Sequence, residues 1–234
     1  MAPDARAALE YSFWPMKLVI GNKNYSSWSL RPWLLLRQAG IAFDEELLSF
    51  NDPNFSARAR RYSPTGRVPV LVDDDLAVWD SLAIAEYVAE KFADKRLWPT
   101  DRAARALARS VCAEMHAGFA HVRNRMPMNC ELSLALGPVE VAVQKDIDRI
   151  LAIWTDCRAR YGSGGSFLFG HFTVADAYYA PLVLRFVSYV TPLPAVAQAY
   201  VETMMALAAM KEWLEAARAE NEYVAVDEPY RASR

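Results

Sequence analysis

Cysteine is scarce in this chain of 234 residues. Only Cys112, Cys130 and Cys157 occur, so their number is odd, and no Cys-x-x-Cys pair exists. A small disulfide-stapled scaffold needs paired cysteines and an oxidising compartment, so that class is excluded. The cysteine content favours a reducing compartment, and we expect a cytoplasmic protein.

An excess of positive charge is also missing. The 26 Lys and Arg residues are balanced by 28 Asp and Glu residues, which gives a net charge of −2, and neither half of the chain carries a basic surplus. Proteins that bind nucleic acid or an anionic membrane surface usually show such a surplus. We therefore expect no nucleic-acid partner and no membrane partner.

Long apolar runs are absent as well. No run reaches the roughly 18 residues that a membrane-spanning helix needs. Residues 1–15 lack the basic start and the apolar stretch of a signal peptide, and we expect a flexible extension there.

Apolar residues are nevertheless plentiful, at 53% of the chain. Because domains average about 150 residues, this length suits one large or two small domains. The first part of the chain alternates between strand and helix patterns, with apolar runs at 17–20, 43–50, 68–72 and 76–79 and helical spacings at 27–40, 54–62 and 81–92. This β-α-β-α-β-β-α order predicts a parallel strand pair with an antiparallel edge, in which Asp73–Asp75 form the hairpin turn.

No strand pattern follows Pro99. Helical spacing recurs over 102–125, 143–161, 173–190, 194–207 and 211–219. In the second of these segments the residues Val143, Ile147, Ile150, Trp154, Cys157 and Tyr161 form one apolar stripe. We expect a small α/β domain over residues 16–98 and an all-helical domain over residues 101–225.

Two serines lie where the first strand gives way to the first helix. The unpaired N–H groups and the positive dipole end of a helix N-terminus favour a bound anion. Ser26 and Ser27 would add hydroxyl donors at that point. Alternatively, these serines only cap the helix, as serines do in many proteins.

Two further segments are candidates for ligand binding. In Val68-Pro69 a cis bond would turn the Val68 backbone outward to meet an extended ligand, although a proline often simply opens a strand. Asp80 and Ser81 stand at a helix start, where the hydroxyl and amides of Ser81 can hold a carboxylate and Asp80 can hold an ammonium group. This would be a receptor for a free amino-acid end, and the alternative is again a helix cap.

Taken together, these segments resemble the cytosolic glutathione transferase superfamily over residues 16–219. The most specific motifs are Ser63–Leu71 (Ser-Pro-Thr-Gly-Arg-Val-Pro-Val-Leu) and Asp80–Tyr87 (Asp-Ser-Leu-Ala-Ile-Ala-Glu-Tyr). Ser26–Arg31 is similar to the Ser-Ser-Cys-x-x-Arg signature of the zeta-type members, with Trp28 in place of the cysteine. The motifs are closest to those of bacterial, serine-type, zeta- and theta-like members.

The resemblance implies a thioredoxin-like N-terminal domain, an all-helical C-terminal domain and a homodimer. It implies glutathione as co-substrate, with Ser26 as the catalytic hydroxyl that supports the thiolate and Ser27 as the alternative. The other implied glutathione-binding residues are Trp28, Arg67 (facing the glycine carboxylate), Val68, Pro69, Asp80 and Ser81.

The leading hypothesis is a glutathione transferase that acts on small hydrophobic electrophiles. A glutathione-dependent maleylpyruvate or maleylacetoacetate isomerase is the alternative enzyme, and a weakly catalytic glutathione-binding module is the non-enzyme alternative. No cysteine precedes Cys112, so disulfide exchange through the N-terminal domain is excluded. His116 and His121 are five residues apart, off one helix face, and we expect no metal. Thr173 and Asp176 match a capping box with a role in folding.

Overall fold

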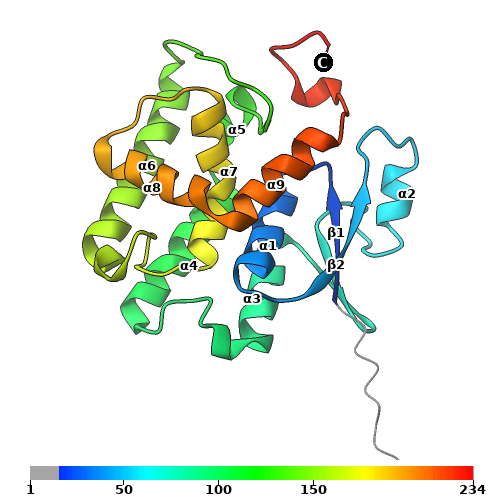
Figure 1. Ribbon diagram of the computed structural model, residues 1–234, viewed down its shortest axis with the longest axis horizontal. Helices are drawn as coiled ribbons and strands as arrows, with labels where there is room; N and C mark the ends of the chain where they lie inside the picture. Colours follow the sequence, from blue (N-terminus) through cyan, green and yellow to red (C-terminus); the bar gives the residue numbers. More distant parts are fainter. Residues whose placement is uncertain (1–15, 234) are drawn as a thin grey trace, which may run out of the picture.

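The computed structural model describes residues 16–233, so the extension expected at 1–15 lies outside the described residues. A four-stranded sheet lies on one side of the molecule, and most of the helices lie on the other (Figure 1). The strands are β1 (Met16–Gly21), β2 (Phe43–Leu48), β3 (Val70–Asp73) and β4 (Leu76–Trp79), in the spatial order β2-β1-β3-β4. β2 runs parallel to β1, whereas the pairs β1–β3 and β3–β4 are antiparallel.

The inner strand β1 has buried apolar residues on both faces, as is typical of a strand between two layers, and Lys17 is its one charged residue. Leu18 and Ile20 belong to the main core together with residues of α1 (Ser27–Gln38) and α3 (Ser81–Lys91). Val19 joins a smaller cluster with a residue of the short helix α2 (Phe55–Ala59). This arrangement is the thioredoxin-like fold that the sequence predicted.

The helical half is built around one buried helix. Every residue of α7 (Val174–Ser188) except Val187 is buried, and an apolar surface all round is typical of a core helix. The helices around it are α4 (Arg102–Ala117), α5 (Ala120–Arg125), α6 (Val141–Tyr161), α8 (Ala195–Ala206) and α9 (Ala208–Ala219). α7 packs against α1 as well as against α4 and α8, so it joins the two halves of the molecule. The predicted all-helical domain is confirmed, and the stripe of α6 is buried from Val143 to Cys157.

The prediction of a single helix over 102–125 is wrong, because the helix is interrupted at Gly118 and Phe119. Gly118 has extended backbone and Phe119 a left-handed conformation with a φ of 61°. A Cβ at Gly118 would lie 2.8 Å from the carbonyl oxygen of Glu114, so the close turn requires glycine. The second helix, α5, is capped by a residue of α6. The Asp146 carboxylate accepts the N–H groups of His121 (3.0 Å) and Val122 (3.1 Å) at its start.

The hairpin turn is shorter than predicted. Asp73 pairs with Leu76 inside the sheet, so only Asp74 and Asp75 form the turn. Asp74 has a φ of 51°, the positive value that tight hairpin turns need. The last long helix also begins earlier than expected, at Ala208.

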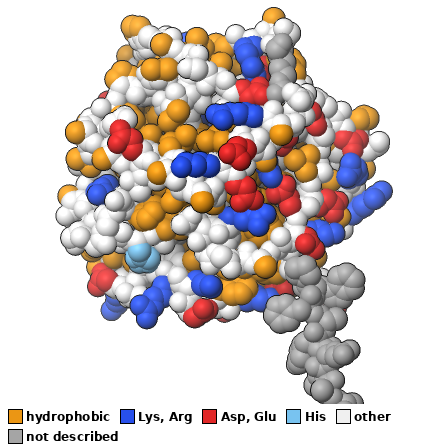
Figure 2. Space-filling view, viewed as in Figure 1, with side chains coloured by type: hydrophobic (Ala, Val, Ile, Leu, Met, Phe, Trp, Pro, Cys, Tyr) orange, Lys and Arg blue, Asp and Glu red, His pale blue; other side chains and the backbone are white. Residues whose placement is uncertain are grey.

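The surface shows no separation of charge on the face seen in Figure 2, where acidic and basic side chains are interspersed. Within residues 16–233, no helix combines the length and the apolar character needed to cross a membrane.

The Asp176 carboxylate fixes the start of α7. It accepts the N–H groups of Thr173 (2.8 Å) and Leu168 (3.0 Å) and the hydroxyl of Tyr200 (3.1 Å), within the predicted capping box. Because Asp176→Ala leaves these buried donors without an acceptor, we expect the free energy of unfolding to fall by about 2–4 kcal/mol in urea denaturation. The control Asp156→Ala removes an exposed ion pair and should cost about 0.5 kcal/mol at most. Equal losses in the two variants would contradict this role of the capping box.

Candidate functional site

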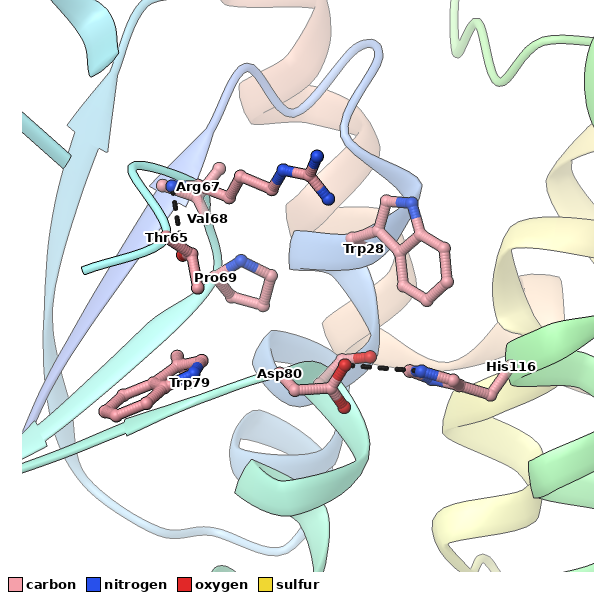
Figure 3. A pocket seen from close by; sticks show the side chains of 9 residues that line it. Trp28, Thr65, Arg67, Val68, Pro69, Trp79, Asp80 and His116 are labelled. Carbon is pink, nitrogen blue, oxygen red and sulfur yellow. Dashed lines mark hydrogen bonds and ion pairs between the residues drawn. The ribbon is translucent and has the colours of Figure 1, made fainter. Parts of the chain in front are cut away.

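Two adjoining cavities lie between the sheet and the helical half. They share the side chains of Trp28, Arg67 and Val68. The first cavity has a volume of about 310 Å³ (Figure 3), and its wall consists of Trp28, Thr65, Arg67, Val68, Pro69, Trp79, Asp80, Ser81 and His116. The second has a volume of about 320 Å³ and is lined by Tyr25, Ser26, Ser27, Trp28, Phe50, Phe55, Arg67, Val68, Arg123, Pro127, Met128, Arg185 and Asp227. All the predicted site residues therefore line one cavity or the other.

Ser26 is the N-cap of α1, and its hydroxyl is part of a short chain of hydrogen bonds. Its Oγ accepts the N–H of Ser29 at 3.3 Å and donates to the Oγ of Ser29 at 2.7 Å. The Oγ of Ser29 also accepts the N–H of Gly21 at 3.1 Å. Ser27 is buried beside Ser26 and lines the same cavity. Both serines thus meet the cavity at the positive end of α1.

The loop before Ser26 is held by the C-terminal end of α9. The carboxylate of Glu220 accepts the N–H groups of Lys23 (2.6 Å) and Asn24 (3.3 Å). The indole of Trp213 donates to the carbonyl of Lys23 at 3.0 Å. These contacts satisfy polar backbone groups that would otherwise be unpaired in a buried loop.

Tyr25 lines the second cavity, but its hydroxyl is hydrogen-bonded to another residue of the protein. It donates to the carboxylate of Glu228 at 2.7 Å, and burial together with this bond raises the pKa of Tyr25 to about 12. A phenol in this state keeps its proton at neutral pH. The serines are therefore the better candidates for contact with an anion.

The peptide bond between Val68 and Pro69 is cis, as the family resemblance implies, and the proline does more than open a strand. Both residues line the first cavity, and the Arg67 side chain before them extends toward Trp28 in Figure 3. Strand β3 begins directly afterwards at Val70, which pairs with Val19 of the central strand. The sheet thus fixes the position of this segment at the cavity wall.

Asp80 has a strained backbone at the start of α3. Its φ is 73°, and its carboxylate accepts the N–H of Leu82 at 2.8 Å. Strain of this kind is concentrated at ligand sites. Ser81 is buried, and its Oγ lies 2.9 Å from the hydroxyl of Tyr178 on α7. Asp80 caps α3 and Ser81 packs against Tyr178, so the structural role of each residue is present. Both residues also line the first cavity, where they could bind a ligand.

His116 is a site residue that sequence reasoning missed. Its Nε2 lies 3.2 Å from the Asp80 carboxylate, and its ring lies edge-on to Trp28 with the ring centres 5.2 Å apart (Figure 3). His116 lacks the spacing of a metal ligand in the sequence, and no local pattern links α4 to the start of α3. Arg123, Arg185 and Asp227 were missed for the same reason, since the first two reach the second cavity from the helical half and Asp227 reaches it from the segment after α9.

The three cysteines take no part in the site. All three are buried, and burial raises the pKa of Cys130 and of Cys157 to about 12 and that of Cys112 well above its usual value. Thiols in this state are poor nucleophiles. In the part of the chain that the structure describes, no three His, Cys, Asp or Glu side chains gather as a metal-binding group.

The chain belongs to the glutathione transferase superfamily. It matches the family descriptions "Glutathione S-transferase, N-terminal domain" over residues 25–91 and "Glutathione S-transferase, C-terminal domain" over residues 102–216. The first match contains both serines, the cis proline and Asp80, and the second contains His116 and both missed arginines.

Solved structures share this fold. A glutathione transferase homologue from Burkholderia GL BGR1 with bound glutathione has a TM-score of 0.65 at 24% identity, covering 89% of this chain and 100% of that one. Ure2p in complex with glutathione has a TM-score of 0.63 at 16% identity, covering 86% and 94%. At these identities the likeness shows the fold.

Curated relatives carry several different names. Glutathione S-transferase Z1 of Arabidopsis thaliana is 28% identical over 157 residues, which cover 62% of this chain and 68% of the relative. The stringent starvation protein A homolog of Histophilus somni is 26% identical over 152 residues, 65% of this chain and 66% of the relative. The dichloromethane dehalogenase of Methylophilus leisingeri is 43% identical over 60 residues, 25% of this chain and only 22% of the relative. The relatives thus share the family but carry names that point to no single activity.

Removing the Glu220 carboxylate should loosen the loop before Ser26. We expect Glu220→Ala to lower the free energy of unfolding by about 1–3 kcal/mol, because two backbone N–H groups lose their acceptor. Glu220→Gln keeps an acceptor oxygen and should recover most of that loss. Glu215→Ala, an exposed change on the same helix, is the control. Urea denaturation measures all three, and a Glu220→Ala variant as stable as the control would contradict the anchoring role.

Proposed function

We propose that the protein is a glutathione transferase that joins the glutathione thiolate to small electrophiles. The observation that carries this proposal is that the start of α1, the Val68–Pro69 segment and the Asp80–Ser81 segment line adjoining cavities in a glutathione transferase fold. The γ-glutamyl end would bind at Asp80 and Ser81. The Val68 backbone would pair with the cysteine unit across Pro69.

The remaining proposed contacts of glutathione involve Trp28 and Arg67, which line both cavities. Arg67 extends toward Trp28 and would face the glycine carboxylate, with the Trp28 indole beside the peptide. The sulfur then lies at the start of α1, in the second cavity. Within this proposal, residues 16–98 form the glutathione-binding domain and residues 101–225 form the domain that lines the electrophile pocket.

Ser26 would act as a hydrogen-bond donor to the thiolate. Lowering the thiol pKa by about two units requires roughly 2.7 kcal/mol. A hydroxyl bonded to a charged acceptor supplies about 1.5–3 kcal/mol, and a helix end adds about 0.3–1 kcal/mol. Ser29 supports this role, because its hydroxyl can turn its own proton toward Ser26 and so free the Ser26 proton for the sulfur.

The reaction needs little more than this activated and positioned sulfur. The thiolate attacks the electrophilic carbon, the carbon–sulfur bond forms, and the leaving group departs with its bonding electron pair. Positioning and thiolate stabilisation are therefore the contributions of the protein. A homodimer and a cytoplasmic location, which the family resemblance and the cysteine content led us to expect, are part of this proposal.

Two other functions have support from the relatives. The likeness to Glutathione S-transferase Z1 and the Ser26–Arg31 segment favour a glutathione-dependent maleylpyruvate or maleylacetoacetate isomerase. The stringent starvation protein A homolog carries a name that states no transferase activity, and a glutathione-binding module with little catalysis is therefore the third candidate. Assaying both diacids beside chlorodinitrobenzene separates the three, since turnover of the diacids alone supports the isomerase and turnover of none supports the module.

Ser26→Ala tests the thiolate donor. We expect the thiol pKa of bound glutathione, followed by ultraviolet absorption of the thiolate, to rise by about one to two units, and kcat/KM for chlorodinitrobenzene to fall roughly 10- to 100-fold. Ser110→Ala on the exposed face of α4 is the control. If Ser27→Ala produces these changes and Ser26→Ala does not, Ser27 is the donor.

Asp80→Asn tests the γ-glutamyl site. Asparagine can still cap α3 through its side-chain oxygen but has no charge for the ammonium group. We therefore expect the KM for glutathione to rise about tenfold with little change in kcat, as for a lost ground-state contact. The matched control is Asp101→Asn, which changes the N-cap of α4 in the same way. A fall in kcat at constant KM would contradict the assignment.

A further inference from the structure

The wall of the second cavity is rich in guanidinium groups. Arg67, Arg123 and Arg185 line it, whereas Asp227 is its only acidic lining residue among the residues that the structure describes. The molecule as a whole is close to neutral, so this concentration of positive charge is local. Clefts lined by one sign of charge concentrate ions of the opposite sign.

A fourth guanidinium lies directly beneath this wall. Arg31 is completely buried on α1, and its group lies over the Trp28 ring at 4.2 Å and over the Tyr178 ring at 5.0 Å. Its Nε donates to the Tyr178 carbonyl at 3.3 Å, but both terminal nitrogens lack a hydrogen-bond partner. Leaving donors of a buried cation unpaired is energetically expensive.

Backbone carbonyls, and no close carboxylate, hold Arg123 and Arg185 in place. Arg123 donates to the carbonyls of Met115, His116 and Gly118, at the end of α4. Arg185, itself buried, donates to the carbonyls of Met126 (2.7 Å) and Pro181 (3.3 Å). Across residues 16–233, neither of these two arginines forms an ion pair with a carboxylate within 4.0 Å.

These groups stay charged at neutral pH. Burial, followed by the charge of Arg123, lowers the pKa of Arg31 to about 9 and that of Arg185 to about 10. Both values lie above 7, so the cations persist and repel one another. Asp227 offsets part of the charge of Arg185, although burial raises the pKa of this carboxyl.

We infer that the second cavity binds an electrophile that carries a carboxylate, which pairs with Arg185 and Arg123. This inference rests on the proposed function and names the substrate class of the same site. Glutathione leaves these two arginines free, because its own carboxylates are placed at Ser81 and at Arg67. An anionic group on the second substrate supplies the counter-charge that the cavity lacks, and guanidinium groups bind carboxylates with charge-assisted, often bidentate hydrogen bonds.

Binding without turnover is the first test. S-methylglutathione fills the peptide site, and calorimetry then compares dinitrobenzoate with dinitrobenzene, which differ in the carboxylate alone. We expect dinitrobenzoate to bind at least about tenfold more tightly. Arg185→Met should abolish that preference, Arg185→Lys should restore part of it, and Arg160→Met, which removes an exposed arginine from α6, should leave it intact. Equal binding of the two compounds to the unmodified protein would overturn the inference.

Turnover provides the second test and separates this inference from the proposed function. Thiolate displaces chloride from chlorodinitrobenzoate and from chlorodinitrobenzene alike, with a carbon–sulfur bond formed and a carbon–chlorine bond broken. We expect Arg185→Met to reduce the ratio of kcat/KM for the acid to that for the neutral compound by about tenfold. If the variant lowers both rates equally and raises the thiol pKa of bound glutathione, the arginines serve the thiolate and the inference fails. If the unmodified protein turns over neither compound yet prefers dinitrobenzoate, the proposed function fails and the anion site stands.

Discussion

Helix α1 is packed on two sides at once, and the position of the site depends on this constraint. Nine of its twelve residues are buried, with one side against the sheet and the other against α7 and α9. Trp33 meets Trp213 of α9 with ring centres 5.1 Å apart, and Arg31 meets Tyr178 of α7. A helix clamped in this way cannot shift along its axis without disturbing both cores. Its N-terminus, which carries Ser26, is therefore fixed at the boundary where the two cavities meet.

The part of the site that contains Ser26 and Ser27 also depends on residues that are distant in the sequence. The loop before Ser26 has no regular partner for its backbone, and Glu220 and Trp213 of α9 supply the missing acceptor and donor. The Glu228 carboxylate, further along the chain, takes the proton of Tyr25. The thioredoxin-like half thus provides the serines, but the C-terminal part of the chain holds them at a defined position.

Local geometry explains which parts of the site were predictable. The N-cap serine, the cis Val68–Pro69 bond and the strained Asp80 each depend on a few neighbouring residues, and such short-range requirements leave a motif in the sequence. His116 and Arg185 lie within helices whose patterns report only burial or exposure. Their contact with the site arises when α4 and α7 pack against α1 and α3. The break at Gly118 was missed because a lone glycine is tolerated in a helix, while the Asp146 cap that stabilises the second helix is far away in the chain.

The net charge of the chain does not report the charge of the second cavity. The nearly neutral composition gave no reason to expect partners that bind through bulk charge, and it also gave no sign of a cavity in which backbone carbonyls orient the guanidinium groups of Arg123 and Arg185. Carbonyl oxygens satisfy the hydrogen-bonding needs of a guanidinium without cancelling its charge, so the field of these arginines remains directed at the cavity. Arg123 and Arg185 come from the helical half, whereas Ser26, Val68 and Asp80 come from the other half. Under the functions proposed above, side chains of the two halves contact different substrates. Such a separation is consistent with relatives of one fold that carry different names.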